Sequence, residues 1–173
     1  IEIAGPVLEK VKLLRAEKNL QTPVLVKIGP DLAADDLKAL VTLIMDAGIE
    51  GIVATNLTHA RPGSLQTRPL PEKGGLSGPP MRDQATQTIA EIYGRTQGKI
   101  VIIGVGGIAS AEDAYAKIRA GASLIELYTG LVYHGMGLAA EISEGLDALL
   151  RRDGFTHISD AIGADARKKQ LAA

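Results

Sequence analysis

Residues 100–108 read Ile-Val-Ile-Ile-Gly-Val-Gly-Gly-Ile, a run of β-branched residues that ends in closely spaced glycines. Such a run predicts a buried strand at 100–104. A helical pattern follows, with Ser110 as its N-cap and Asp113, three residues on, as the carboxylate of a capping box. Glycine amides approach an anion closely, and a helix N-terminus carries partial positive charge. The segment therefore predicts a strand, an anion-binding turn and a helix in succession.

Three further apolar runs, each bounded by glycine, proline or polar residues, predict strands at 23–28, 51–55 and 123–127. Apolar residues at helical spacing predict helices at 6–18, 37–44, 110–121 and 138–152. Gly48 stands where a left-handed C-terminal cap would end the second of these helices. Strands and helices that alternate with short connections form right-handed βαβ units. The fold class is therefore α/β, with a parallel sheet that we expect to be covered on both faces.

A second glycine turn follows the last predicted strand. Leu127-Tyr128-Thr129-Gly130 ends that strand, and its Thr129 hydroxyl and backbone amides would face the same ligand as Gly106 and Gly107. Glycines can also serve tight packing alone, and G-x-G-x-x-G, the dinucleotide fingerprint, is absent. Two such turns on adjacent strands favour one phosphate site.

The number of strands indicates part of a larger fold. Four βα units are half of a (β/α)8 TIM barrel, which typically has ~250 residues and binds phosphate after its last two strands. We therefore expect residues 1–173 to supply roughly the second half of such a barrel, without a second domain. A doubly wound sheet is the alternative. The chain begins at Ile1 without an initiator Met, which suggests that an amino-terminal half is lost or comes from a partner.

Composition excludes several classes of function. The chain has 173 residues, of which 46% are hydrophobic and 23% charged, as in globular domains. A net charge of −1 shows no excess of basic residues of the kind that binds nucleic acid. The absence of cysteine rules out disulfides, thiolate metal sites and a cysteine nucleophile. The histidines show neither zinc nor triad spacing, and no apolar run reaches the ~20 residues of a membrane-spanning helix.

Two polar residues mark the ends of the first two strands. Lys27 interrupts an apolar strand, and a buried ammonium needs an anionic partner or convergent acceptors, so we expect it to face a site. Its alternative role is an internal ion pair with Glu126. Asn56 can offer a donor and an acceptor to a planar ligand, or it can simply cap a turn.

Residues 56–79 form a long connection without clear periodicity, from Asn56 to Gly-Gly-Leu-Ser-Gly-Pro at 74–79. Connections beyond ~12–15 residues are usually functional or disordered. Gly78 before two prolines suggests a fixed backbone that approaches a ligand, and a β-hairpin above the barrel is compatible with this interpretation.

Several segments resemble class 2 dihydroorotate dehydrogenases in order and spacing. The resemblance runs from about Pro23 to Gly163, and its motifs are 24–32, 54–56, 74–78, 103–108, 118–124 and 127–131, with the tail 159–165. Independent motifs in one register are more specific than a single pattern. By resemblance, the chain is the carboxyl-terminal half of such an enzyme.

The resemblance implies FMN-dependent oxidation of dihydroorotate to orotate in pyrimidine biosynthesis, with a quinone as electron acceptor. It implies that Lys27 lies beside the flavin N1/O2 edge, where a cation stabilises the reduced ring. The flavin ring would be lined by Thr55 and Gly78. The remaining positions would be Gly106, Gly107, Tyr128 and Thr129 at the phosphate, and Asn56 and Leu57 at the substrate.

The chain also departs from the family. Leu57 stands where the family usually has Thr, so a hydroxyl contact to substrate is lost or passed to Thr58. The family's catalytic base is a Ser in the first half of the barrel, and no segment before Lys27 matches it; Ser77 matches a flavin-loop position. The family's quinone-binding helices also have no counterpart. For the whole enzyme, the resemblance implies peripheral attachment to the cytoplasmic face of a bacterial inner membrane. We expect this chain alone to be soluble.

Two other functions are compatible with the same residues. The chain could be a non-catalytic, phosphate-binding half barrel that pairs with another subunit. It could also belong to a barrel oxidoreductase that uses the same flavin site for another substrate, which Leu57 alone favours.

Overall fold

The computed structural model describes residues 2–63, 65 and 73–171. Residue 64 and residues 66–72, within the predicted connection 56–79, lie outside the described residues. In chain order the elements are α1 (Ala4–Glu17), β1 (Leu25–Ile28), α2 (Ala34–Asp46), β2 (Gly51–Ala54), the 3₁₀ turn η1 (Pro79–Met81), α3 (Arg82–Thr96), β3 (Val101–Val105), α4 (Ala111–Ala120), β4 (Leu124–Glu126), α5 (Thr129–His134), α6 (Leu138–Arg152), α7 (Ile158–Ala161) and α8 (Ala164–Leu171).

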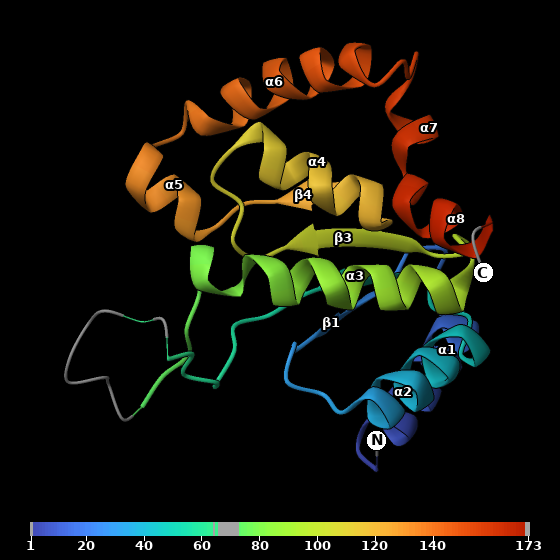
Figure 1. The fold of residues 1–173 in the computed structure, drawn as a ribbon. Coiled ribbons are helices and arrows are strands. Elements are labelled where there is room, and N and C mark those ends of the chain that lie inside the picture. The colour runs from blue at the N-terminus through green and yellow to red at the C-terminus, as the bar shows by residue number, and fades with distance from the viewer. Residues whose placement is uncertain (1, 64, 66–72, 172–173) are drawn as a thin grey trace.

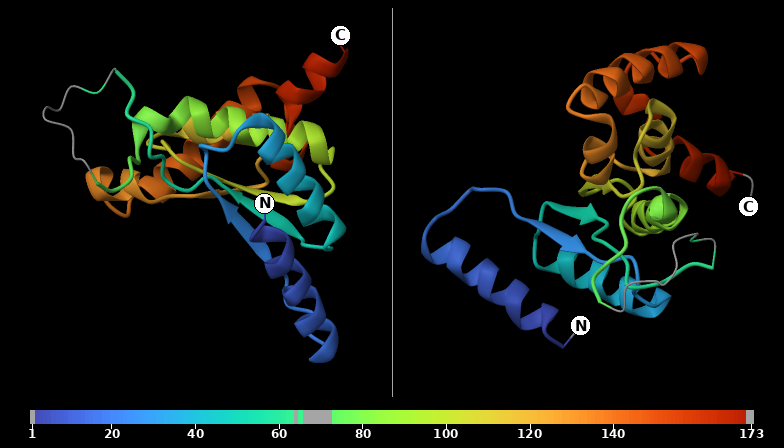
Figure 2. Two further views of the ribbon diagram at one scale, coloured as in Figure 1. Left: turned by 90° about the horizontal axis from the view of Figure 1, so that it is seen from below. Right: turned by 90° about the vertical axis from the view of Figure 1, so that its left-hand side faces the viewer.

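The strands form one four-stranded parallel sheet in the order β1-β2-β3-β4. Each neighbour in the sheet is also the next strand along the chain, with a helix between each pair, as in a barrel. Figure 2 shows the chain advancing from its blue to its red end across the molecule. The predicted α/β class is confirmed, and a doubly wound order is not observed.

The predicted helix signals are largely confirmed. Gly48 has φ +67° just after α2, and the Ser110 hydroxyl accepts the Asp113 N–H at the start of α4. The capping box is wrong in one detail, because the Asp113 carboxylate accepts the N–H of Ala109 instead of that of Ser110. The sequence did not predict α3, which lies along the sheet beside α4 in Figure 1.

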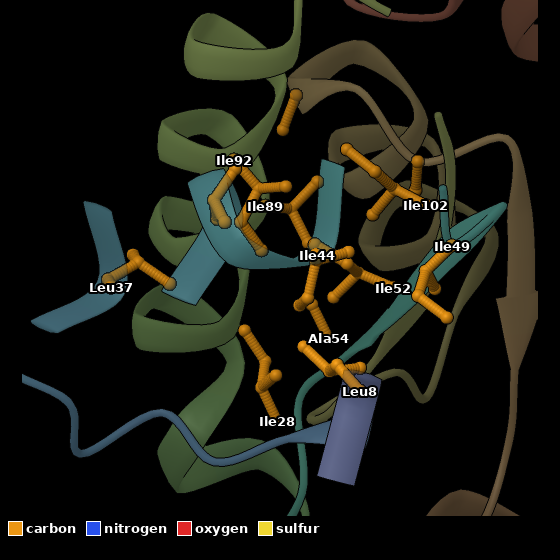
Figure 3. Close-up of a cluster of buried hydrophobic side chains, with 13 residues drawn as sticks. Leu8, Ile28, Leu37, Ile44, Ile49, Ile52, Ala54, Ile89, Ile92 and Ile102 are labelled. Carbon is orange, nitrogen blue, oxygen red and sulfur yellow. The ribbon is translucent and has the colours of Figure 1, made fainter. Parts of the chain in front are cut away.

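The main core lies between the sheet and its helices. Ile52 and Ile102 point from β2 and β3 toward α3, and both are fully buried. They meet Ile44 of α2 and Ile89 and Ile92 of α3, which are also fully buried (Figure 3). Burying such a side chain contributes about 1.5–3 kcal/mol. This helix-covered side is called the outer face below.

The opposite side of the sheet, called the inner face below, is open. Leu25, Val101 and Leu124 point to it and remain 38%, 41% and 57% exposed. The expectation that the sheet is covered on both faces is therefore wrong for this chain. Only one layer of helices packs on the described strands, on the outer face. In a closed barrel, side chains from the other strands fill the side that is open here.

Candidate functional site

A pocket lies at the carboxyl ends of the strands, where the active sites of parallel barrels are found. Its cavity of about 340 Å³ is at the lower end of the range for small-ligand sites. All nine residues predicted from the sequence line it: Lys27, Thr55, Asn56, Leu57, Gly78, Gly106, Gly107, Tyr128 and Thr129. The structure thus brings together side chains and amides from all four strand ends.

The turn after β3 supplies free backbone donors. Gly106 and Gly107 have φ values of +116° and +72°, which L side chains rarely adopt. A Cβ on Gly107 would stand 2.5 Å from the Cα of Arg82. Within the described part of the chain, the N–H groups of Gly106 and Gly107 donate no hydrogen bond. Amides held in this way beside the start of α4 suit an anion.

The turn after β4 closes the other side of the pocket. Tyr128 is the N-cap of α5, and its side chain is 77% exposed. The Thr129 hydroxyl donates to the Ser77 hydroxyl over 2.8 Å. A Cβ on Gly78 would come within 3.0 Å of the Thr129 methyl group. The connection before η1 is therefore fastened directly to α5 beside the glycine turn.

Thr55 carries an unpaired polar atom at the base of the pocket. It is 1% exposed and follows a cis peptide bond from Ala54. Its N–H donates to the carbonyl of Val105, but its hydroxyl has no partner in the described residues. A buried hydroxyl without a partner costs about 1–3 kcal/mol. A polar ligand in the pocket would supply that partner.

Lys27 and Glu126 form an ion pair across the inner face. The Lys27 Nζ lies 3.3 and 3.5 Å from the two Glu126 oxygens. The residues belong to the two edge strands, β1 and β4, so the pair spans β2 and β3. The expectation of a buried ammonium is wrong, because the Lys27 side chain is 41% exposed. The alternative ion pair is present, and it lies inside the pocket.

Asn56 and Leu57 sit at the mouth of the pocket and are both exposed. The Asn56 side-chain oxygen accepts the Leu57 N–H over 2.9 Å, which is the turn-capping role, and its amide NH₂ stays available. The hydroxyl of Thr58 donates to Asp31 over 2.5 Å, and Thr58 is 1% exposed. Thr58 therefore does not replace a hydroxyl at position 57.

Asp31 holds the start of the long connection. Its carboxylate accepts the His59 N–H over 2.7 Å as well as the Thr58 hydroxyl. Burial opposes the charged form, but hydrogen bonds from Thr58, His59 and Gln84 outweigh it and lower the pKa of Asp31. Thr58 also forms an antiparallel bridge with Leu76, so the predicted hairpin is present as a single bridge.

A charge network around the buried Lys117, beneath the glycine turn, was not predicted. Arg82 Nε donates to the Gly107 carbonyl and lies 2.7 Å from the Asp113 carboxylate. Lys117, which is fully buried, donates to the Arg82 carbonyl and to the Thr86 hydroxyl. Burial lowers the pKa of Lys117 to about 8. The network joins the start of α3 to α4.

Two kinds of feature are absent from the described residues. No group of His, Asp or Glu is arranged to hold a metal ion. None of the helices there has the length and apolar character needed to cross a bilayer.

Comparison with known proteins identifies relatives. The family model of dihydroorotate dehydrogenase matches residues 4–150. A dihydroorotate dehydrogenase (quinone) of Cereibacter sphaeroides is 51% identical over 90% of this chain and 44% of its own length. The mitochondrial dihydroorotate dehydrogenase (quinone) of Mus musculus is 50% identical over 88% of this chain and 39% of its own length.

The fold has the same relatives. A crystal structure of DHODH from Eimeria tenella in complex with ferulenol aligns with a TM-score of 0.81 and 38% identity. The alignment covers 85% of this chain and 40% of that one, so the four strands are an arc of a TIM barrel. The chain spans less than half the length of the curated relatives it matches. On these matches, the chain belongs to the dihydroorotate dehydrogenase family.

Proposed function

We propose that this chain carries the cofactor half of a quinone-dependent dihydroorotate dehydrogenase, with FMN as the cofactor. The reaction would convert dihydroorotate and quinone to orotate and quinol, a step of pyrimidine biosynthesis. The observation that carries the proposal is the pocket, in which unpaired glycine amides, an unpaired buried hydroxyl and a lysine converge. The named relatives set the substrate class.

The residues present fit FMN. Free N–H groups at Gly106 and Gly107, beside the start of α4, suit its phosphate. The unpaired Thr55 hydroxyl and the Lys27 ammonium suit the polar edge of its ring. Gly78 lines the same pocket and packs against Thr129, so its backbone borders the space that the ring would fill. Bound FMN supplies a two-electron relay between dihydroorotate and quinone.

The substrate would lie at the mouth of the pocket. Asn56 can donate its amide NH₂ to a pyrimidine carbonyl while its oxygen holds the Leu57 N–H. Leu57 offers only apolar contact, and the Thr58 hydroxyl is committed to Asp31. We therefore expect weaker substrate binding than a hydroxyl at position 57 would give.

The general base would come from outside these four strands. Ser77 lies in the pocket, but its hydroxyl accepts the hydrogen bond of Thr129. Neither Lys27 nor Glu126 is free, because they pair with each other. Base catalysis typically contributes 10²- to 10⁴-fold, so we expect full turnover only when the rest of a barrel supplies it.

An apolar surface beside the pocket supports an apolar acceptor. Tyr128, Val132, Tyr133 and Met136, on and around α5, are each 76–80% exposed. Exposed apolar side chains in such numbers mark surfaces for partners or membranes. We infer that a quinone approaches here, and that the protein works peripherally at the cytoplasmic face of a bacterial inner membrane.

The test is FMN binding, followed by reduction. We expect the purified chain to bind FMN, as measured by quenching of flavin fluorescence. Lys27→Ala should weaken binding, and Gly107→Ala should abolish it because its Cβ collides with Arg82. Gly94→Ala is the matched control, since in the described part of the chain nothing beyond its own helix backbone and its chain neighbours lies within 4 Å of its Cβ position. Anaerobic dihydroorotate should bleach the flavin once the rest of a barrel is supplied. Absence of FMN binding would refute the proposal.

A second candidate is a non-catalytic phosphate-binding half barrel. The open inner face favours it, because Leu25, Val101 and Leu124 are exposed there and could pair with another subunit. This candidate predicts tight self-association and phosphate binding without any flavin. Analytical ultracentrifugation with and without FMN distinguishes the two.

A further inference from the structure

The pocket holds one charge that the proposed function leaves unused, the carboxylate of Glu126. Lys27 and Glu126 are the only members of its lining with a formal charge at neutral pH; all of the lining lies in the described part of the chain. The carboxylate lies 3.3 Å from the Lys27 ammonium. Their charges cancel, so the pocket is close to neutral.

That balance matters to a ligand whose charge changes. Reduction of FMN by two electrons with uptake of one proton leaves it with one more negative charge. Lys27 favours the more negative form, and Glu126 opposes it by Coulomb repulsion. The two side chains are 41% and 46% exposed, so solvent weakens each effect without abolishing it.

We propose that Glu126 balances the charge of Lys27 and thereby limits the preference of the pocket for reduced over oxidised FMN. This inference rests on the proposed function, because it takes FMN as the ligand. Glu126 reaches Lys27 from the opposite edge of the four-stranded sheet, so the distance between the two side chains depends on how strongly the sheet curves. Its role would be to tune the cofactor, and the fold would not require it.

The test compares the two oxidation states in four proteins. The affinity of the chain for oxidised FMN is measured by fluorescence, and the reduced-to-oxidised affinity ratio by spectroelectrochemical titration, with an electrode as the source of electrons. Glu126→Gln leaves Lys27 unopposed, so the ratio should rise by on the order of tenfold. Lys27→Met leaves Glu126 unopposed, so the ratio should fall by a similar factor. The double variant restores a neutral pocket, so the ratio should return close to wild type.

Glu144→Gln is the matched control, because it removes the same charge from an exposed position on α6, outside the pocket. It should leave the ratio unchanged. An unchanged ratio in Glu126→Gln, or a double variant that behaves like Lys27→Met, would overturn the inference while the proposed function stands. Failure of the wild-type chain to bind FMN would overturn both.

Discussion

The two faces of the sheet come from the same four strands but do different work. On the outer face, Ile52 and Ile102 are fully buried against helices. On the inner face, Leu124 is 57% exposed, and Lys27 and Glu126 meet across open space. The outer face therefore carries the stability of the chain, and the inner face and its rim carry the ligand site.

The largest test of this difference removes one apolar side chain from each face. Ile52→Ala should lower the free energy of unfolding by about 2–5 kcal/mol, because the fully buried side chain leaves a cavity. Leu124→Ala should change it by less than about 1 kcal/mol, because the side chain is already exposed. Urea denaturation measures both. Equal losses would contradict the assignment of stability to the outer face.

The next test concerns the buried lysine beneath the glycine turn. The pKa of Lys117 is lowered to about 8 by burial, from 10.5. Between pH 8 and pH 10.5 the unfolded chain therefore binds more protons than the folded chain. The destabilisation of the fold by the buried ammonium is complete below pH 8 and disappears as the pH rises toward 10.5. A shift of this size corresponds to about 3 kcal/mol. We expect Lys117 to make the free energy of unfolding rise over that range.

Lys117→Met should abolish this rise, and urea denaturation at pH 7.5 and pH 10 measures it as a difference from wild type. Lys38→Met, at an exposed position on α2, is the matched control and should leave the rise intact. If wild type and Lys117→Met show the same pH dependence, burial of the Lys117 ammonium does not lower the free energy of unfolding.

The sequence predicted what depends on local pattern. The four strands were placed within two residues, because parallel strands are short apolar runs bounded by glycine or polar residues. The glycine turns and the polar strand ends were predicted because strand ends of a parallel sheet converge at one edge. Thr55, Leu57 and Tyr128 were assigned only by the resemblance to the family. Helix α3 was missed because Thr88 and Thr96 occupy two of its buried positions and interrupt the apolar period.

Other features could not be predicted because they depend on tertiary contacts. Lys117 is surrounded only when α3 packs on α4, and nothing in its own segment marks it as buried. The unpaired hydroxyl of Thr55 likewise depends on atoms from other strands. Glu126 was considered only as a partner of Lys27, because the sequence does not show that both face one cavity.

A smaller effect separates stability from binding at the base of the pocket. Thr55→Val replaces an unpaired buried hydroxyl with a methyl group of similar size. The free energy of unfolding should rise by about 1 kcal/mol, while the affinity for FMN should fall about fivefold to tenfold as one hydrogen bond is lost. Denaturation and FMN titration measure the two quantities. Thr55→Ser, which keeps the hydroxyl, should retain the affinity. If Thr55→Val loses stability, the hydroxyl has a partner within the protein.

The smallest effect lies at the opposite end of the sheet, far from the pocket. Glu50 precedes β2, and hydrogen bonds from Arg15 of α1 and from the Val24 N–H lower its pKa from 4.5 to about 2. This stabilisation is complete above pH 4.5 and is lost as the pH falls toward 2. Glu50→Gln should therefore lower the free energy of unfolding modestly at pH 7 and leave it less sensitive to acid, whereas FMN affinity at pH 7 should stay unchanged. A change in FMN affinity would mean that the two ends of the sheet are coupled, and the separation between a stabilising face and a binding rim would then be too simple.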